Sequence, residues 1–148
     1  MDEVKMDAQQ RQDAAAIRLN LDKRRELYNE NNMYEAAKLF TQDMIMLQPL
    51  LPLLKGRTGM QNSWRISRND LGIMRCDYGI HEFLVLKPDM AITQEWGIFY
   101  NDKDEVLTKT IGIMVWKKKE GKWYCHIQST ILTDRDITKW DDTAVNTK

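Results

Sequence analysis

The sequence predicts an α+β fold in which a curved, mixed and mainly antiparallel sheet wraps around N-terminal helices. Three observations lead to this prediction. Helical patterns gather in the first half of the 148 residues, four long β-patterned runs fill the second half, and short turn signals separate these runs. Helices placed first and strands last favour a two-layer domain over repeated βαβ units. Because a long sheet twists and curls around whatever packs on it, we expect a cone with a pocket inside.

The helices are expected upstream of residue 73. Apolar residues recur at spacings of three and four from Ala14 to Tyr28, which is the pattern of one helix face. A run rich in asparagine then breaks the pattern, because Asn favours turns. Pro52 makes the apolar segment around it a loop rather than a central strand. The expected elements are a helix over 14–28, a short helix over 33–40, a strand over 43–47, a loop over 50–55 and a helix over 60–68.

Four long strands complete the predicted domain. Their turns are marked by Pro88, by the Asn- and Asp-rich segment 101–104, and by Gly121. The strands are expected over 73–86, over 90–100, and as two runs within 105–134. This gives one domain over 14–134, preceded by a flexible N-terminus over 1–13 and followed by a polar C-terminal tail over 135–148.

Composition excludes several classes of partner. The 22 basic residues balance the 22 acidic ones, so no field of one sign draws nucleic acid or a membrane surface. No stretch approaches the roughly 20 apolar residues that span a bilayer. Cys76 and Cys125 are expected to be buried free thiols rather than a disulfide, as in a reducing compartment. We therefore expect a cytoplasmic protein that binds neither nucleic acid nor membrane.

Both faces of the last two strands carry apolar side chains. In the run 110–116, Met114 and Trp116 alternate with Ile113 and Val115, whereas a sheet with one face in water alternates apolar and polar residues. The outer face is therefore expected to meet another surface. A second copy of the sheet in a two-fold homodimer is the favoured partner. The alternative is the C-terminal tail folded over this face.

Two segments resemble a known family. Residues 39–49, LFTQDMIMLQP, with Gly56-Arg57 opening a helix, resemble the segment L-Y-T-x-D-A-x-x-x-x-P … G-R of the nuclear transport factor 2-like superfamily. Residues 115–123, VWKKKEGKW, resemble its hairpin V-W-K-x-x-D-G-x-W, which is common in SnoaL-like members and in a branch related to calcium/calmodulin-dependent kinase association domains. The resemblance covers residues 14–133. It implies a conical, cystatin-like α+β barrel that is usually dimeric through its sheet.

The resemblance does not carry over a catalytic set. The superfamily includes isomerases, cyclases, dehydratases, hydrolases, transport receptors and oligomerisation domains, so the fold alone does not give the function. Ketosteroid isomerase uses an Asp base before the Pro that ends its first strand, and that position matches Gln48, which cannot abstract a proton. Its oxyanion-hole Tyr matches Arg24, and its Asp donor falls near Gly112. An isomerase of that design is therefore not expected.

The same match implies which side chains face the pocket. Their Met and Trp surfaces suit an apolar or aromatic small molecule, although such side chains can equally meet and fill a core. One β-bulge would reverse the inward and outward faces of a strand. The implied pocket residues are Arg24, Met44, Met46, Gln48, Trp64, Gln94, Trp96, Met114, His126, Gln128 and Thr130.

Arg24 and His126 are the two candidates for chemistry. Arg24 interrupts an apolar stripe, where it could hold an anionic ligand group; the favoured alternative is that it snorkels at the edge of the stripe or pairs with Glu95. His126 could act as an acid or base, but a strand histidine beside Gln128 is more often a hydrogen-bonded pocket wall. No metal-ligand spacing and no phosphate-binding loop occurs, so no cofactor is expected.

Three functions remain open. The leading hypothesis is a homodimer that binds a small apolar or amphiphilic molecule in the cone without the usual catalytic residues. The second is a SnoaL-like or ketosteroid isomerase-like enzyme that uses His126 and Arg24. The third is an oligomerisation or adaptor module with a filled core. The sequence does not decide whether the protein is an enzyme.

Overall fold

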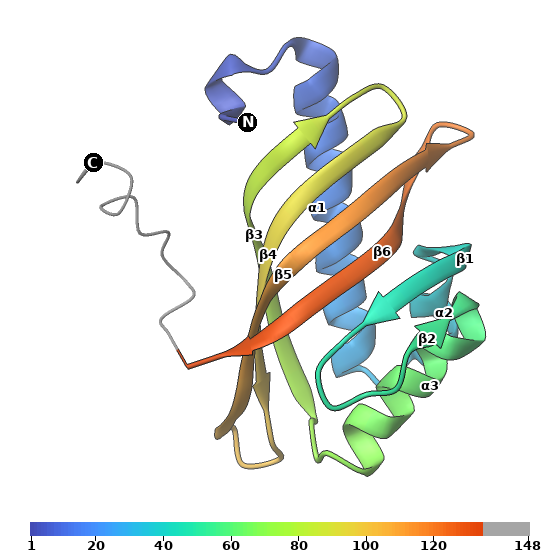
Figure 1. The fold of residues 1–148 in the computed structure, drawn as a ribbon, viewed down its shortest axis with the longest axis vertical. Coiled ribbons are helices and arrows are strands. Elements are labelled where there is room, and N and C mark those ends of the chain that lie inside the picture. Colours follow the sequence, from blue (N-terminus) through green and yellow to red (C-terminus); the bar gives the residue numbers. More distant parts are fainter. Residues whose placement is uncertain (135–148) are drawn as a thin grey trace.

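A computed structural model describes residues 1–134 and shows helices packed on one face of a six-stranded sheet (Figure 1). The predicted tail over 135–148 lies outside the described residues. The predicted α+β class is confirmed. The elements are the 3-10 helix η1 (Glu3–Lys5), α1 (Ala8–Asn29), α2 (Met33–Ala37), β1 (Phe40–Leu47), β2 (Leu54–Lys55), α3 (Gly56–Asn69), β3 (Arg75–Leu86), β4 (Met90–Tyr100), β5 (Val106–Lys119) and β6 (Lys122–Thr133).

Helix α1 begins earlier than the sequence pattern predicts. Its first turns are polar, so the apolar stripe from Ala14 onward misses them. The Asp7 side chain accepts a hydrogen bond from the Gln10 backbone, and the Gln10 side chain accepts one from the Asp7 backbone. This capping box satisfies two backbone donors at the helix start. Met6, just before the cap, is buried, and η1 and the first turns of α1 lie within the segment 1–13 that the sequence predicts to be flexible.

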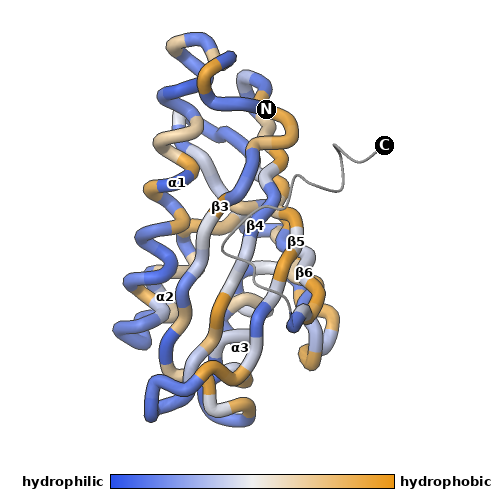
Figure 2. Tube along the Cα trace, turned by 90° about the vertical axis from the view of Figure 1, so that its left-hand side faces the viewer, coloured by the Kyte–Doolittle hydropathy of each residue, from blue (hydrophilic) through white to orange (hydrophobic). Residues whose placement is uncertain are grey.

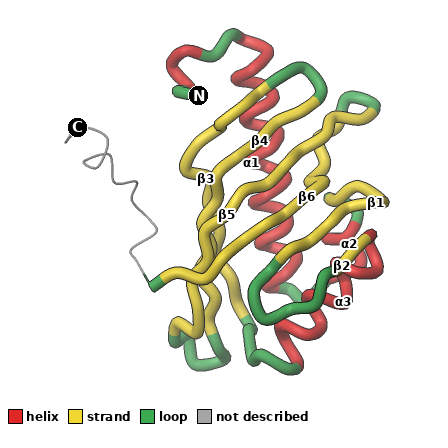
Figure 3. Tube along the Cα trace, viewed as in Figure 1, coloured by secondary structure: helices red, strands yellow, loops and turns green. Residues whose placement is uncertain are grey.

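The sheet is mixed and mainly antiparallel, as predicted. Its strand order is β2-β1-β6-β5-β4-β3, with β1 parallel to β6 and every other pair antiparallel. The long helix α1 runs along one face, while α2 and α3 lie beside β1 (Figure 3). Two predicted boundaries are wrong: Phe40 opens β1 instead of ending the second helix, and Leu54–Lys55 form a short edge strand within the predicted loop.

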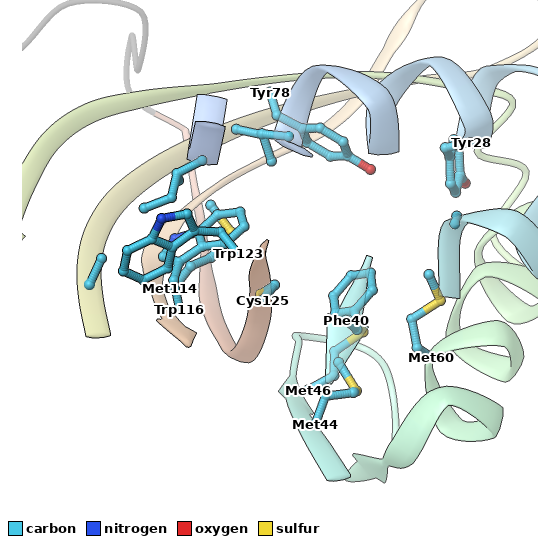
Figure 4. Close-up of a cluster of buried hydrophobic side chains, with 14 of the residues drawn as sticks. Tyr28, Phe40, Met44, Met46, Met60, Tyr78, Met114, Trp116, Trp123 and Cys125 are labelled. Atoms are coloured by element: carbon cyan, nitrogen blue, oxygen red, sulfur yellow. The ribbon is translucent and has the colours of Figure 1, made fainter. Parts of the chain in front are cut away.

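The inner face of the sheet can be assigned from strand pairing. Thr93, Met114 and Gln128 are directly paired across β4, β5 and β6, so they share one face. Gln128 contacts Arg24 of α1, which identifies this face as the one that the helices cover. Side chains from α1, α3, β1, β5 and β6 meet there in one buried core (Figure 4).

Two buried tryptophans show how polar atoms are accommodated in this core. The Trp116 indole nitrogen donates to the hydroxyl of Thr93 at 2.9 Å, and the Trp123 indole nitrogen donates to the carboxylate of Asp13 at 3.0 Å. Asp13 also pairs with Lys118 at 3.0 Å. Buried indoles usually find such acceptors, and these two tie the inner face of the sheet together and to α1.

Gly112 provides a test of the close strand packing at the centre of the sheet. A methyl group at this position would overlap the carbonyl oxygen of Ser129 and the Cα of Thr130 on β6. We therefore expect Gly112→Ala to lower the free energy of unfolding by about 1–3 kcal/mol, the usual effect of overpacking. Urea unfolding followed by circular dichroism measures this change.

Gly59→Ala is the matched control. Gly59 lies inside α3, and a methyl group there would make only ordinary contacts with Leu54. Replacing a helical glycine by alanine is worth about 0.5–1 kcal/mol of added stability. The two substitutions should therefore shift the urea midpoint in opposite directions, and equal effects would contradict the strand spacing described here.

Candidate functional site

Arg24 lies at the centre of the cone. Helix α1 directs it at the inner face of the sheet, where its side chain is only 1% exposed. One terminal nitrogen donates to Gln128 Oε1 at 2.7 Å and the other lies 3.4 Å from the Met114 sulfur. The guanidinium carbon lies 4.4 Å from the centre of the Phe40 ring and 5.6 Å from that of Tyr78. The predicted snorkelling of Arg24 at the edge of the helix stripe is therefore wrong.

Glu95 shares this interior, where it was expected only as a partner for Arg24. It lies on the inner face of β4 and is 3% exposed. Burial raises the pKa of its carboxyl to about 7, although the positive charge of Arg24 acts in the opposite direction. No nitrogen of Arg24 lies within 4.0 Å of a carboxylate oxygen in residues 1–134. The predicted ion pair between these two residues is thus not formed.

The two cysteines are also in the interior. Cys76 on β3 and Cys125 on β6 are buried free thiols, which confirms that part of the sequence analysis. Burial raises the pKa of each thiol to about 12, so both stay protonated near neutral pH. A thiol that stays protonated is a poor nucleophile, and these cysteines therefore act as small core residues.

A small cavity lies at one end of the space between the helices and the inner face of the sheet, and we call this end the mouth of the cone. Its volume is about 40 Å³, and it lies between the segment 48–51, the end of α3 and the ends of the long strands. This is room for a few water molecules, whereas typical ligand sites measure roughly 300 Å³ or more. Of the predicted pocket residues, Gln48 and Thr130 line it. The other lining residues are Pro49, Leu50, Leu51, Ser67, Leu71, Ile73, Phe99, Thr108, Thr110 and Leu132.

The remaining inward-facing candidates fill the core. Met44, Met46 and Met114 are fully buried, and Trp64 packs edge-on against Tyr28 with ring centres 4.7 Å apart. The labelled methionines point into the same packed cluster as the aromatic rings (Figure 4). The sequence therefore placed these side chains on the correct face, and in the described conformation they occupy the interior themselves.

The predicted inward face of β4 is wrong. Trp96 is paired with Gly79 on β3 and with Ile111 on β5, and it lies on the outer face together with Gln94. A methyl group at Gly79 would overlap the Trp96 ring, so the glycine leaves room for this indole to lie over the strand. The inner face of β4 belongs instead to Thr93 and Glu95, which are both buried.

His126 is displaced from the interior by a β-bulge. Cys125 pairs with Trp116 and Ile127 pairs with Val115, which leaves His126 as an extra residue in β6. Its Nδ1 lies 2.8 Å from the hydroxyl of Thr41 and 3.6 Å from the carboxylate of Asp43. The histidine is thus hydrogen-bonded as predicted, but on the outer side of the sheet rather than in the pocket wall.

Residues 1–134 offer neither a metal centre nor a membrane span. Within this range, no group of three or more His, Cys, Asp or Glu side chains is arranged to hold a metal ion. No helix in the same range is both long and apolar enough to cross a bilayer. The interior polar cluster of Arg24, Glu95, Gln128 and Thr130 is therefore the candidate site.

Comparison of the fold with solved structures gives consistent matches. An NTF2-like protein with a cystatin-like fold from Novosphingobium aromaticivorans superposes with a TM-score of 0.72 at 13% identity, covering 93% of this chain and 94% of that one. A putative calcium/calmodulin-dependent protein kinase II association domain from Xanthomonas campestris gives 0.67 at 15% identity, covering 92% and 94%. The chain has the nuclear transport factor 2-like fold. In sequence, it matches no family model and no curated protein.

A ketosteroid isomerase-like protein from Erwinia carotovora atroseptica superposes with a TM-score of 0.66 at 15% identity, covering 82% of this chain and 96% of that one. In the present chain, Gln48, the residue after β1, supplies an amide at the mouth, and Gly112 supplies no side chain. Glu95 is paired with Gly112 on the neighbouring strand, so the interior carboxyl group lies beside that position.

The buried carboxyl group of Glu95 makes stability depend on pH. Its pKa is about 7 in the folded state, and in the unfolded chain it is near 4.5, the ordinary value of a glutamate side chain. The native state therefore holds the proton more tightly, and stability falls as pH rises from about 4.5 to 7. Between pH 5 and 8 we expect a loss of roughly 2–3 kcal/mol, which Glu95→Gln should abolish.

Urea unfolding of both proteins at pH 5 and pH 8 measures this difference. Glu120→Gln, at an exposed position in the β5–β6 turn, is the control and should keep the slope of the parent protein. The burial of a proton-binding carboxyl group at this site would be contradicted if the free energy of unfolding of the parent protein did not fall from pH 5 to pH 8 relative to that of Glu95→Gln.

Proposed function

We propose that this chain is a homodimeric binding domain. Two cones would join through the outer faces of their sheets, and each would take up a small amphiphilic molecule at its mouth. The observation that carries the proposal is the apolar outer face of the sheet, which the helices leave uncovered on the described chain. The cavity at the mouth of the cone supports the second part of the proposal, the binding of a small amphiphilic molecule.

The outer face is rich in isoleucine. Ile113 on β5 is 46% exposed and Ile131 on β6 is 62% exposed, and these two strands lie in the middle of the sheet. Orange, apolar stretches are visible along β5 (Figure 2). Large exposed apolar patches mark interaction sites. By strand pairing, the apolar members of this face are Ile45, Leu47, Ile92, Trp96, Ile98, Ile111, Ile113, Val115, Ile127 and Ile131.

A second copy of the same sheet suits this face better than the C-terminal tail. Two-fold pairing lets the same patch cover itself, and Lys109 and Lys117 at the two ends of outer β5 provide a charged rim of the kind that surrounds interface cores. The tail, by composition, offers only Ile137, Trp140 and Val145 as large apolar residues, against ten on the face.

The mouth of the cone supports uptake of a small amphiphile. Its walls combine apolar Leu71, Ile73 and Phe99 with the polar groups of Ser67 and Thr130, the mixture typical of ligand sites. The cavity of about 40 Å³ is small, so a ligand larger than a few waters requires the segment 48–51 to move outward. Leu50 in that segment is largely exposed and has a φ of 67°, which a non-glycine residue rarely adopts.

The geometry gives no support to an enzyme that uses His126 and Arg24 together. Arg24 reaches Gln128 on the inner face, whereas His126 contacts Thr41 and Asp43 on the outer side of the same sheet. One substrate cannot touch both without crossing the strands. Glu95 is the interior group whose pKa, about 7, suits proton transfer near neutral pH.

The dimer is tested by placing a charge on the outer face. Ile113→Glu should convert a species of twice the 17.5 kDa chain mass into a monomer, because a buried unpaired carboxylate on each side of a two-fold interface is strongly unfavourable. Light scattering coupled to gel filtration measures the mass. Leu19→Glu changes an apolar residue that is 69% exposed on α1 and should leave the dimer intact. A parent protein that is monomeric at micromolar concentration would contradict the proposal.

Uptake at the mouth is tested by filling the cavity. Neutral amphiphiles such as hexanol and benzyl alcohol, at tenfold their Kd, should raise the Tm by about 3–6 °C. Thr130→Leu places a larger apolar side chain in the cavity and should remove the shift. Thr41→Val, at a position on the outer side beside His126, is the control and should retain it. No shift with any neutral amphiphile in the parent protein would contradict uptake at the mouth.

A further inference from the structure

We infer that the interior of the cone holds a binding site for a small carboxylate, in which Arg24 supplies the positive charge. The inference rests on the proposed function in one respect, since the ligand enters through the mouth. It adds the chemistry of the ligand's head group and the residues that hold it.

The positive charge of Arg24 has no counter-charge beside it among the described residues. Arginine is ionised at any ordinary pH, and this guanidinium is 1% exposed with neutral partners: Gln128, the Met114 sulfur, the Cys125 thiol and two aromatic rings. A buried charge without a counter-charge is unfavourable by several kcal/mol. An anion bound at the guanidinium would supply the missing negative charge.

Three buried hydrogen-bonding atoms on the inner side of the cone lack partners in the described part of the molecule. Arg24 Nε, Glu95 Oε1 and Thr130 Oγ1 are buried and make no hydrogen bond within the described chain. They come from α1, β4 and β6, and all three belong to side chains on the inner side of the cone. Buried polar atoms are nearly always paired in native proteins, so three such atoms in one interior indicate an additional polar occupant.

A ligand can reach Arg24 from the surface through the mouth cavity. Thr130 lines the mouth cavity, and Gln128 lies two residues away on the same face of β6, bonded to Arg24 at 2.7 Å. The Gln128 side chain therefore lies between Thr130, which lines the cavity, and the guanidinium of Arg24. A carboxylate that replaces the Gln128 oxygen can accept from Nε and a terminal nitrogen of Arg24 together, the two-point geometry that arginine forms with carboxylates.

Glu95 selects a carboxylate head group and couples binding to a proton. When protonated, its carboxyl group can donate a hydrogen bond to the bound anion; when ionised, it repels the anion. The other titratable groups facing this interior are Tyr28 on α1, Cys76 and Tyr78 on β3, and Cys125 on β6, and burial raises the pKa of all four far above neutral. Glu95 is therefore the group that changes charge near pH 7, and affinity should fall as pH rises.

Acetate and its neutral analogue acetamide test the site directly. With ionic strength held constant by sodium chloride, acetate at tenfold its Kd should raise the Tm by about 3–6 °C at pH 6, and acetamide should not. The acetate affinity should weaken about fivefold between pH 7 and pH 8 in the parent protein, since the protonated fraction of Glu95 falls from about one half to about one tenth when its pKa is about 7. Glu95→Gln should bind acetate with no such dependence.

Arg24→Met tests the charge itself. Replacing buried charged groups by apolar side chains of similar volume is often neutral or stabilising, so this variant should fold and should lose the acetate response while keeping the shift by neutral amphiphiles. Arg24→Lys retains a positive charge and should retain a weakened response, which keeps the test valid if the Met variant does not fold.

The outcomes separate this inference from the proposed function. An acetate shift that survives in Arg24→Met, or equal shifts by acetate and acetamide in the parent protein, would overturn the carboxylate site. A parent protein that responds to neutral amphiphiles but not to acetate would overturn this inference alone. A protein that responds to neither would overturn uptake at the mouth as well, while the dimer would still be decided by its mass in solution.

Discussion

The buried guanidinium of Arg24 is the constraint on which the rest of the interior depends. A fixed positive charge inside a low-dielectric interior is unfavourable, and neutral dipoles and aromatic faces that contact it offset part of that cost. Gln128, Phe40 and Tyr78 supply these contacts from three different strands. Together they fix the position of α1 on the sheet. Glu95 is close enough for the positive charge of Arg24 to act on its pKa, but the two side chains form no ion pair. The charge of Arg24 is therefore not balanced by a carboxylate of residues 1–134 in this interior.

The sheet separates two kinds of surface. Its inner side carries the polar cluster within a core of Met and aromatic side chains, and its outer side carries isoleucines around Trp96. The bulge at His126 keeps both arrangements compatible, because it moves the histidine to the outer side and returns Gln128 and Thr130 to the inner side. A binding interior and a pairing exterior can thus share the same strands.

The sequence was informative where periodicity decides the structure and misleading where long-range contacts do. The strand 90–100 was predicted to the residue, since turn signals bound it. Its inner face was not, because Thr93 and Glu95 alternate with Gln94 and Trp96, and the room for the indole depends on Gly79, which lies opposite it on another strand. Glu95 escaped notice as a site residue because a strand carboxylate normally faces water. The early start of α1 had a local signal, the pair Asp7 and Gln10, whereas the bulge at His126 had none.

A crystal structure determined near neutral pH would test the central claim most directly, through the density beside Arg24. The account predicts a small anion or ordered water between the guanidinium and Glu95, with no protein carboxylate within ion-pair distance. A Glu95 carboxylate bonded directly to Arg24, closing the interior with its charges balanced, would contradict it.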